Sequence, residues 1–195
     1  MNLHEVDAFE VRQRITLMVN RYEIRLPSPN GAGPLLAMAQ QKRMAFKEQV
    51  TFYADEGRTV PIFSFKARQR LDLGATYDVF DAEGRPIGWF RKDFAKSLLR
   101  STWHLGAPGV EAVGAERNQF IALLRRAWDF LPVIGDLPVP FVFHFDFADA
   151  GGQVVLTSER RMSLRDVYHV TVPGARVDGR VAAAMAVALD ALQHR

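Results

Sequence analysis

Hydrophobic residues run without interruption along one stretch near the end of the chain. Residues 181–189 read VAAAMAVAL, and Asp190 is the first polar residue after them. A helix that is apolar on every side must be surrounded by protein or by lipid. Residues 181–192 would span only about 18 Å as a helix, whereas about 20 apolar residues are needed to cross a bilayer. We therefore predict a helix over about residues 179–192 that is enclosed by protein, with Asp178 as its N-cap.

The chain upstream of this helix alternates polar and apolar positions with period two, which is the pattern of half-buried strands. Residues 11–26 alternate in this way and predict one long strand that is bent or broken near Asn20. Asp and Gly favour tight turns, so DEG at 55–57 and DAEGRP at 81–86 predict two hairpins over residues 50–65 and 76–91. Further strands are expected at residues 35–40, 101–105, 141–148, 153–158 and 167–172.

These strands do not alternate with helices in the way that indicates a parallel sheet. A twisted antiparallel sheet of about ten strands tends to curl, and closing it removes both edges. One amphipathic helix is predicted at residues 117–131, followed by Pro132, and we expect it to pack on the outside of the sheet. The sequence thus predicts a mainly β fold, a closed antiparallel barrel enclosing the hydrophobic C-terminal helix, in a single domain over residues 1–195.

Composition excludes several kinds of site. The chain is 48% hydrophobic and 24% charged, as in ordinary globular proteins, and it contains no cysteine. The lack of cysteine rules out disulfides, thiolate nucleophiles and most structural zinc sites. No secretory signal is visible, so we expect a cytoplasmic protein without a transmembrane span. The net charge of +3 allows an anionic partner, but the dense basic runs of nucleic-acid-binding tails are missing.

Two groups of basic residues are candidates for binding anionic lipid head groups or phosphates. The first group is Lys66, Arg68 and Arg70, and the second is Arg91, Lys92 and Lys96. In the first group, spacing of two residues along a strand points all three cations to one face, where they could hold a phosphate or an anionic surface. The second group lies near Trp89 and Phe94, and basic residues beside aromatic ones suit a membrane interface. The alternative for both groups is a solvated strand face.

Catalytic and metal-binding patterns are weak. His144 and Asp146 share one strand face and could pair as a base and its orienting group, but no nucleophile motif accompanies them. His104 and His169 stand singly inside strands, so metal ligands at a recognised spacing are missing. The sequence contains neither a P-loop nor a G-x-G-x-x-G motif. We therefore predict a non-enzymatic protein with no metal and no cofactor.

The order of these signals resembles the superfamily of tubby C-terminal domains, phospholipid scramblases and LURP-one-related proteins, and the LURP-one-related branch above all. The resemblance rests on TYDVFDAEGRPIGWFRK at 76–92, TWHL at 102–105, SERR at 158–161 and RDVYHVTVP at 165–173 before the apolar helix. It implies a barrel of about twelve strands around that helix. Calcium takes about six to eight oxygen ligands, and only Asp166 and Asp178 precede the helix among several arginines, so a scramblase-like calcium site is not expected.

Two functions remain open from the sequence. The first is a non-enzymatic binding module that recognises anionic phospholipid head groups or phosphates at a membrane surface, as a peripheral protein. The second is a protein-interaction or structural domain, in which the helix at 117–131 docks a protein partner or a second copy of the chain. Binding of nucleic acid is the least favoured by the charge pattern.

Overall fold

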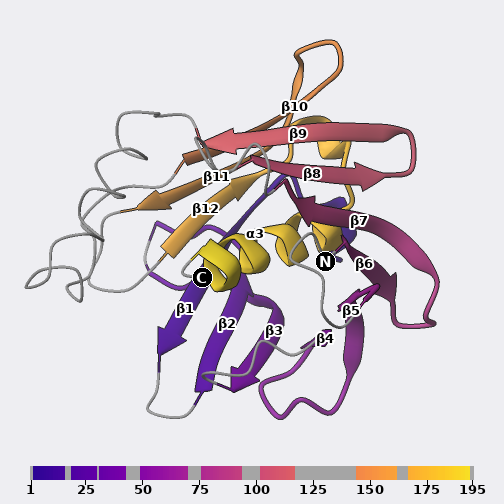
Figure 1. The fold of residues 1–195 in the computed structure, drawn as a ribbon. Coiled ribbons are helices and arrows are strands. Elements are labelled where there is room, and N and C mark those ends of the chain that lie inside the picture. Colours follow the sequence, from indigo (N-terminus) through magenta and orange to yellow (C-terminus); the bar gives the residue numbers. More distant parts are fainter. Residues whose placement is uncertain are drawn as a thin grey trace, which may run out of the picture.

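The computed structural model describes residues 2–15, 19–29, 31–42, 49–69, 76–93, 102–116, 144–161 and 167–193. Within these residues, twelve strands form one closed barrel in which every pair of neighbouring strands is antiparallel (Figure 1). Each strand pairs with its neighbours in sequence, and β12 closes the ring against β1. The predicted mainly β fold, a closed antiparallel barrel of about twelve strands, is confirmed.

The elements follow one another as a meander that ends in a helix. The strands are β1 (Ala8–Ile15), β2 (Val19–Arg25), β3 (Leu35–Lys42), β4 (Gln49–Tyr53), β5 (Pro61–Ala67), β6 (Thr76–Asp81), β7 (Pro86–Lys92), β8 (Thr102–Ala107), β9 (Val110–Glu116), β10 (His144–Asp149), β11 (Val154–Arg161) and β12 (Val167–Thr171). The described helices are the short 3-10 turns η1 (Leu3–Glu5) and η2 (Pro173–Ala175) and the α-helix α3 (Gly179–Gln193).

The structure differs from the sequence-based expectations about strands in two places. The strand predicted over residues 11–26, bent or broken near Asn20, consists of two strands, β1 and β2, which end and begin before Asn20 and pair with Val11 opposite Ile24. Residues 16–18 are TLM, which contain none of the residue types that usually mark a turn, so the pattern showed no break there. Strand β9 was not predicted. Its buried positions are the small residues Ala112 and Gly114 and the polar Glu116, while Val113 is 46% exposed, so the usual contrast between the two faces is missing.

Helix α3 is the apolar helix that the sequence predicts. Residues 181–190 are each at most 5% exposed, and the helix contacts β1 and β12 as well as β5, β6 and β7. These two groups of strands lie on opposite sides of the ring, and Figure 1 shows α3 at the centre of the view. The backbone N–H of Arg180 donates to Asp178 Oδ1 at 2.9 Å, so Asp178 is the N-cap, as expected.

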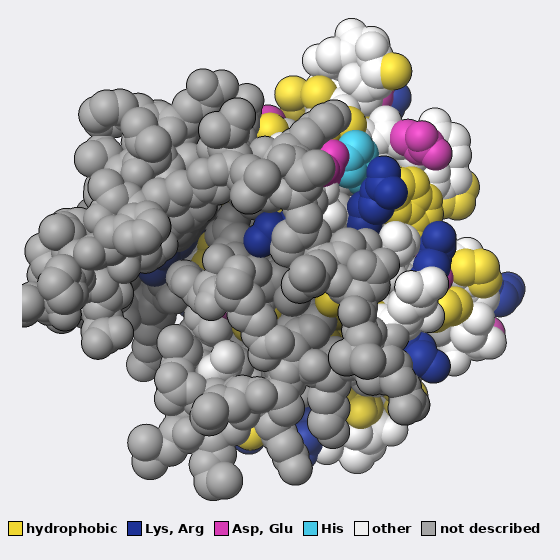
Figure 2. Space-filling model, in the orientation of Figure 1, with side chains coloured by type: hydrophobic (Ala, Val, Ile, Leu, Met, Phe, Trp, Pro, Cys, Tyr) yellow, Lys and Arg dark blue, Asp and Glu magenta, His cyan; other side chains and the backbone are white. Residues whose placement is uncertain are grey.

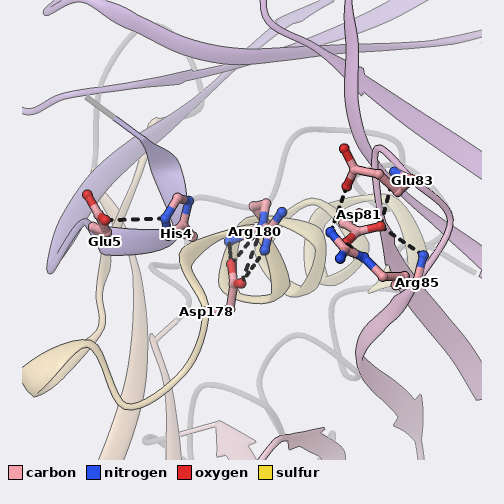
Figure 3. A network of polar contacts seen from close by, with 7 residues as sticks. All are labelled: His4, Glu5, Asp81, Glu83, Arg85, Asp178 and Arg180. Carbon is pink, nitrogen blue, oxygen red and sulfur yellow. Dashed lines mark hydrogen bonds and ion pairs between the residues drawn. The ribbon is translucent and has the colours of Figure 1, made fainter.

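Ion pairs surround the N-terminal end of α3 (Figure 3). Arg180 Nη2 lies 2.7 Å from Asp178 Oδ2, and on the β6–β7 turn Arg85 contacts Asp81 at 2.8 Å and Glu83 at 3.0 Å. The hydrogen bonds to Asp178 raise the pKa of Arg180, and the charges of Asp81 and Glu83 act in the same direction. The start of the helix is therefore fixed by paired charges that come from its own cap and from a strand turn.

The predicted amphipathic helix at residues 117–131 lies outside the described residues. Among the described helices, none is both long enough and apolar enough to cross a membrane.

Candidate anion-binding surface

A row of polar and aromatic side chains crosses the outer wall of the barrel on strands β5, β6 and β7. Lys66 lies opposite Asp78, and Asp78 lies opposite Trp89. The neighbouring residues Phe65 and Phe90 are 0% exposed and belong to the core. Because side chains alternate between the two faces of a sheet, Lys66, Asp78 and Trp89 share the outer face.

One cation on this wall is held by a carboxylate. Arg68 Nε donates to Asp78 Oδ2 at 2.8 Å, and Arg68 Nη2 donates to Asp78 Oδ1 at 2.7 Å. These two bonds use the planar fork of the guanidinium group and raise the pKa of Arg68. The Arg68 side chain is 54% exposed and that of Asp78 is 23% exposed. The positive charge of Arg68 is thus compensated by a partner on the next strand.

Two other cations on the same wall, Lys66 and Arg91, are exposed. Arg91 lies opposite Thr76 on β6 and opposite His104 on β8. With respect to the described part of the chain, neither Lys66 nor Arg91 takes part in an ion pair. Exposed basic side chains without a carboxylate partner are the groups that an anionic ligand can pair with directly.

Trp89 shares the outer face with these cations and is held against the sheet; it stands two residues before Arg91 on β7 and in one row with Asp78 and Lys66. A Cβ atom placed on Gly106 of β8 would come within 2.3 Å of Trp89 Nε1, so the indole ring packs directly over this glycine. Figure 2 shows Lys and Arg side chains next to hydrophobic ones along the right side of this face of the molecule. Tryptophan is favoured at the boundary between water and lipid, where its apolar ring and polar N–H are both satisfied. We call Lys66, Arg68, Trp89 and Arg91 the basic strip.

Among the other predicted site residues, Lys92 does not join the basic strip. Lys92 lies opposite the buried Trp103, and its Nζ is 5.9 Å from the centroid of that ring, which is the geometry of a cation–π contact. The adjacent Arg91 therefore faces the other way from Lys92. Arg70 and Lys96 lie outside the described residues.

Two histidines of the described strands, His104 and His144, lie close to carboxylates. His104 Nε2 is 3.2 Å from Asp93 Oδ2, next to Arg91, and His144 Nδ1 is 3.8 Å from Glu159 Oε1. In the described ranges, no group of three or more His, Cys, Asp or Glu side chains is placed to hold a metal ion.

A second polar cluster is buried at the other end of α3 from its cap. Asp190 accepts hydrogen bonds from the hydroxyl groups of Tyr22, at 2.9 Å, and of Tyr168. Gln13 Nε2 donates to the Tyr22 hydroxyl at 3.4 Å. Burial raises the pKa of Tyr22, and the negative charge of Asp190 raises it further. The one carboxylate on the apolar helix is therefore paired, and this cluster ties α3 to β2 and β12.

Sequence reasoning missed Asp78 and the two tyrosines. The alternation in TYDVFD already puts Asp78 on the polar face of its strand. Its contact with Arg68 depends on the register of two strands from different hairpins, which the pattern does not specify. The same holds for Tyr22 and Tyr168, which are far apart in sequence and meet only when the ring closes.

Comparison with known proteins identifies the family of the chain. A family model described as LURP-one-related matches residues 36–190. Among solved structures, the chain is similar to a porin-like protein from Bacteroides uniformis, with 9% sequence identity and a TM-score of 0.28 over 85% of this chain and 96% of the other. At that score the likeness supports no conclusion. The comparison with curated proteins found no match.

Proposed function

The chain belongs to the LURP-one-related family, and on this premise we propose that it is a non-enzymatic binding module. Its ligand would be an anionic phospholipid head group or phosphate at a membrane surface, and the contact would be made by the basic strip. The observation that carries the proposal is the pair of exposed cations Lys66 and Arg91, which form no ion pair within the described residues and share one outer wall with Trp89. Each basic residue near an anionic membrane surface contributes about 1 kcal/mol of binding.

We also propose that the barrel encloses α3 along its length. The burial of residues 181–190 and the contacts of the helix with opposite sides of the ring support this arrangement. A helix that fills the interior directs ligand contacts to the outer wall, where the basic strip lies. The inner wall adds to this filling, because Phe52 and Phe63 stack at 4.1 Å between ring centroids and Tyr77 and Phe90 at 5.2 Å.

Co-sedimentation with vesicles tests the proposal. We expect the protein to bind vesicles of phosphatidylcholine mixed with phosphatidylserine, to ignore vesicles of phosphatidylcholine alone, and to be released by salt. Lys66→Gln and Arg91→Gln should each weaken binding about fivefold, the equivalent of about 1 kcal/mol. Arg21→Gln is the matched control, because Arg21 is an exposed arginine on β2, away from the basic strip. Equal binding to both kinds of vesicle, or equal losses for all three variants, would refute the proposal.

A further inference from the structure

Asp78 stands in the middle of the basic strip, although its charge opposes the binding of an anion. It lies directly between Lys66 and Trp89 in the strand register. Both of its carboxylate oxygens accept a hydrogen bond from Arg68. A bidentate pair of this kind uses the same fork of N–H groups that an arginine offers to a phosphate. While the pair persists, Arg68 cannot present that fork to a ligand.

We propose that Asp78 is an internal counter-ion that occupies the guanidinium group of Arg68. The native basic strip then binds an extended anionic surface through Lys66 and Arg91, and it does not bind a single phosphate group through Arg68. The inference rests on the proposed function and deepens it, because it states which kind of anionic ligand the strip selects. The ligand of the basic strip would then be a lipid surface that carries many separate charges.

The spacing of the two free cations supports this choice. Lys66 is on β5 and Arg91 is on β7, with β6 between them, so their backbones are roughly 10 Å apart across the sheet. Arg91 also lies opposite Thr76 and Lys66 opposite Asp78, which adds an offset of two residues along the strands. An anionic bilayer offers charges at such separations, whereas one phosphate group is too small to span them unless both side chains bend toward each other over β6.

Removal of the carboxylate charge of Asp78 should leave the guanidinium group of Arg68 available to a ligand. Asp78→Asn keeps the size of the side chain but loses the charge that holds the guanidinium group. We expect this variant to bind vesicles containing phosphatidylserine about fivefold more tightly than the native protein, by the contribution of one added cation. Inorganic phosphate at constant ionic strength should compete with vesicles for the variant and should have little effect on the native protein.

A substitution of Arg68 that keeps its positive charge tests the role of the bidentate geometry on its own. Arg68→Lys keeps the positive charge and removes bidentate geometry. In the native background it should change vesicle binding less than twofold, since the fork is already occupied. In the Asp78→Asn background it should abolish competition by phosphate, which depends on the bidentate geometry, while vesicle binding again changes less than twofold because the charge is kept. Asp78→Ser is a second way to remove the carboxylate if Asp78→Asn folds poorly.

Glu83→Gln is the matched control. It removes one negative charge from another arginine pair, since Glu83 contacts Arg85 at 3.0 Å on the β6–β7 turn. If Asp78→Asn binds no more tightly than Glu83→Gln, or if phosphate competes equally well with Asp78→Asn and with Asp78→Asn/Arg68→Lys, the inference is overturned while the proposed function stands. If no variant and no native protein binds the anionic vesicles, the proposed function fails, and the inference fails with it.

Discussion

Replacement of Tyr22 by phenylalanine removes one hydroxyl group from the buried cluster around Asp190. Tyr22 is 0% exposed and Asp190 is 5% exposed, so water cannot readily replace the lost hydrogen bond of 2.9 Å. A hydrogen bond to a charged group contributes about 1.5–3 kcal/mol net, and an under-satisfied buried carboxylate adds to the cost. We therefore expect Tyr22→Phe to lower the free energy of unfolding by about 2 kcal/mol.

That loss corresponds to a measurable shift in the midpoint of thermal unfolding. The entropy of unfolding of a 195-residue chain is about 0.4 kcal/mol/K, so about 2 kcal/mol lowers the Tm by about 5 °C. In the Asp190→Asn background the same tyrosine change should cost less, because the partner is no longer charged. A double-mutant cycle between Tyr22 and Asp190 measures this coupling directly.

The measurement is thermal and urea unfolding followed by circular dichroism. Tyr53→Phe is the control, because Tyr53 is a partly exposed tyrosine of β4 and the change removes the same hydroxyl group. If Tyr22→Phe and Tyr53→Phe have the same stability, or if the cycle shows no coupling, the cluster does not hold α3 in place and the reasoning is refuted.

Three further predictions follow from other contacts. The pKa of Tyr22 in the folded protein lies above the unfolded value of about 10, so the contribution of Tyr22 to stability is complete below about pH 10 and is lost as the pH rises further. In urea unfolding from pH 9 to 11, the native protein should therefore lose stability with pH more steeply than Tyr22→Phe. Gly179→Val should lower the Tm by about 5 °C or more, because a Cβ atom there would come within 2.0 Å of the backbone oxygen of Leu3. A variant as stable as the native protein would show that η1 is not packed on the start of α3. Gly106→Val should displace Trp89 and shift its fluorescence to longer wavelength, and an unchanged emission spectrum would contradict the packing of the ring on this glycine.

The sequence predicted those parts of the fold that depend on local patterns. The unbroken apolar run at residues 181–189 is sufficient to identify a buried helix, and the Asp and Gly residues of the turn at 81–86 are sufficient to place a hairpin. Strand β9 could not be found, since Gly114 is a buried position that Phe147 fills from the opposite strand. Local patterns report the burial of a residue's own side chain, and they fail where a neighbour supplies the apolar volume.

For the candidate site, the sequence predicted which residues are basic and share a face, but it did not predict which carboxylate pairs with which cation. The spacing of Lys66 and Arg68 predicts a shared face, and both lie on β5 or directly after it. The compensation of Arg68 by Asp78 depends on strand register, which a single-strand pattern cannot supply. The separation of Arg91 from Lys92 follows from simple alternation and could have been predicted from the strand assignment alone.

Binding of one double variant to anionic vesicles tests the central claim most directly. Lys66→Gln/Arg91→Gln is compared with Arg21→Gln/Arg58→Gln, which removes the same charge from exposed arginines outside the basic strip. We predict that the first variant binds phosphatidylserine-containing vesicles about 25-fold more weakly than the native protein, from about 1 kcal/mol for each cation, and that the second binds within about threefold of it. Equal binding by the two double variants, with both folded by circular dichroism, would contradict the assignment of anion binding to this wall of the barrel.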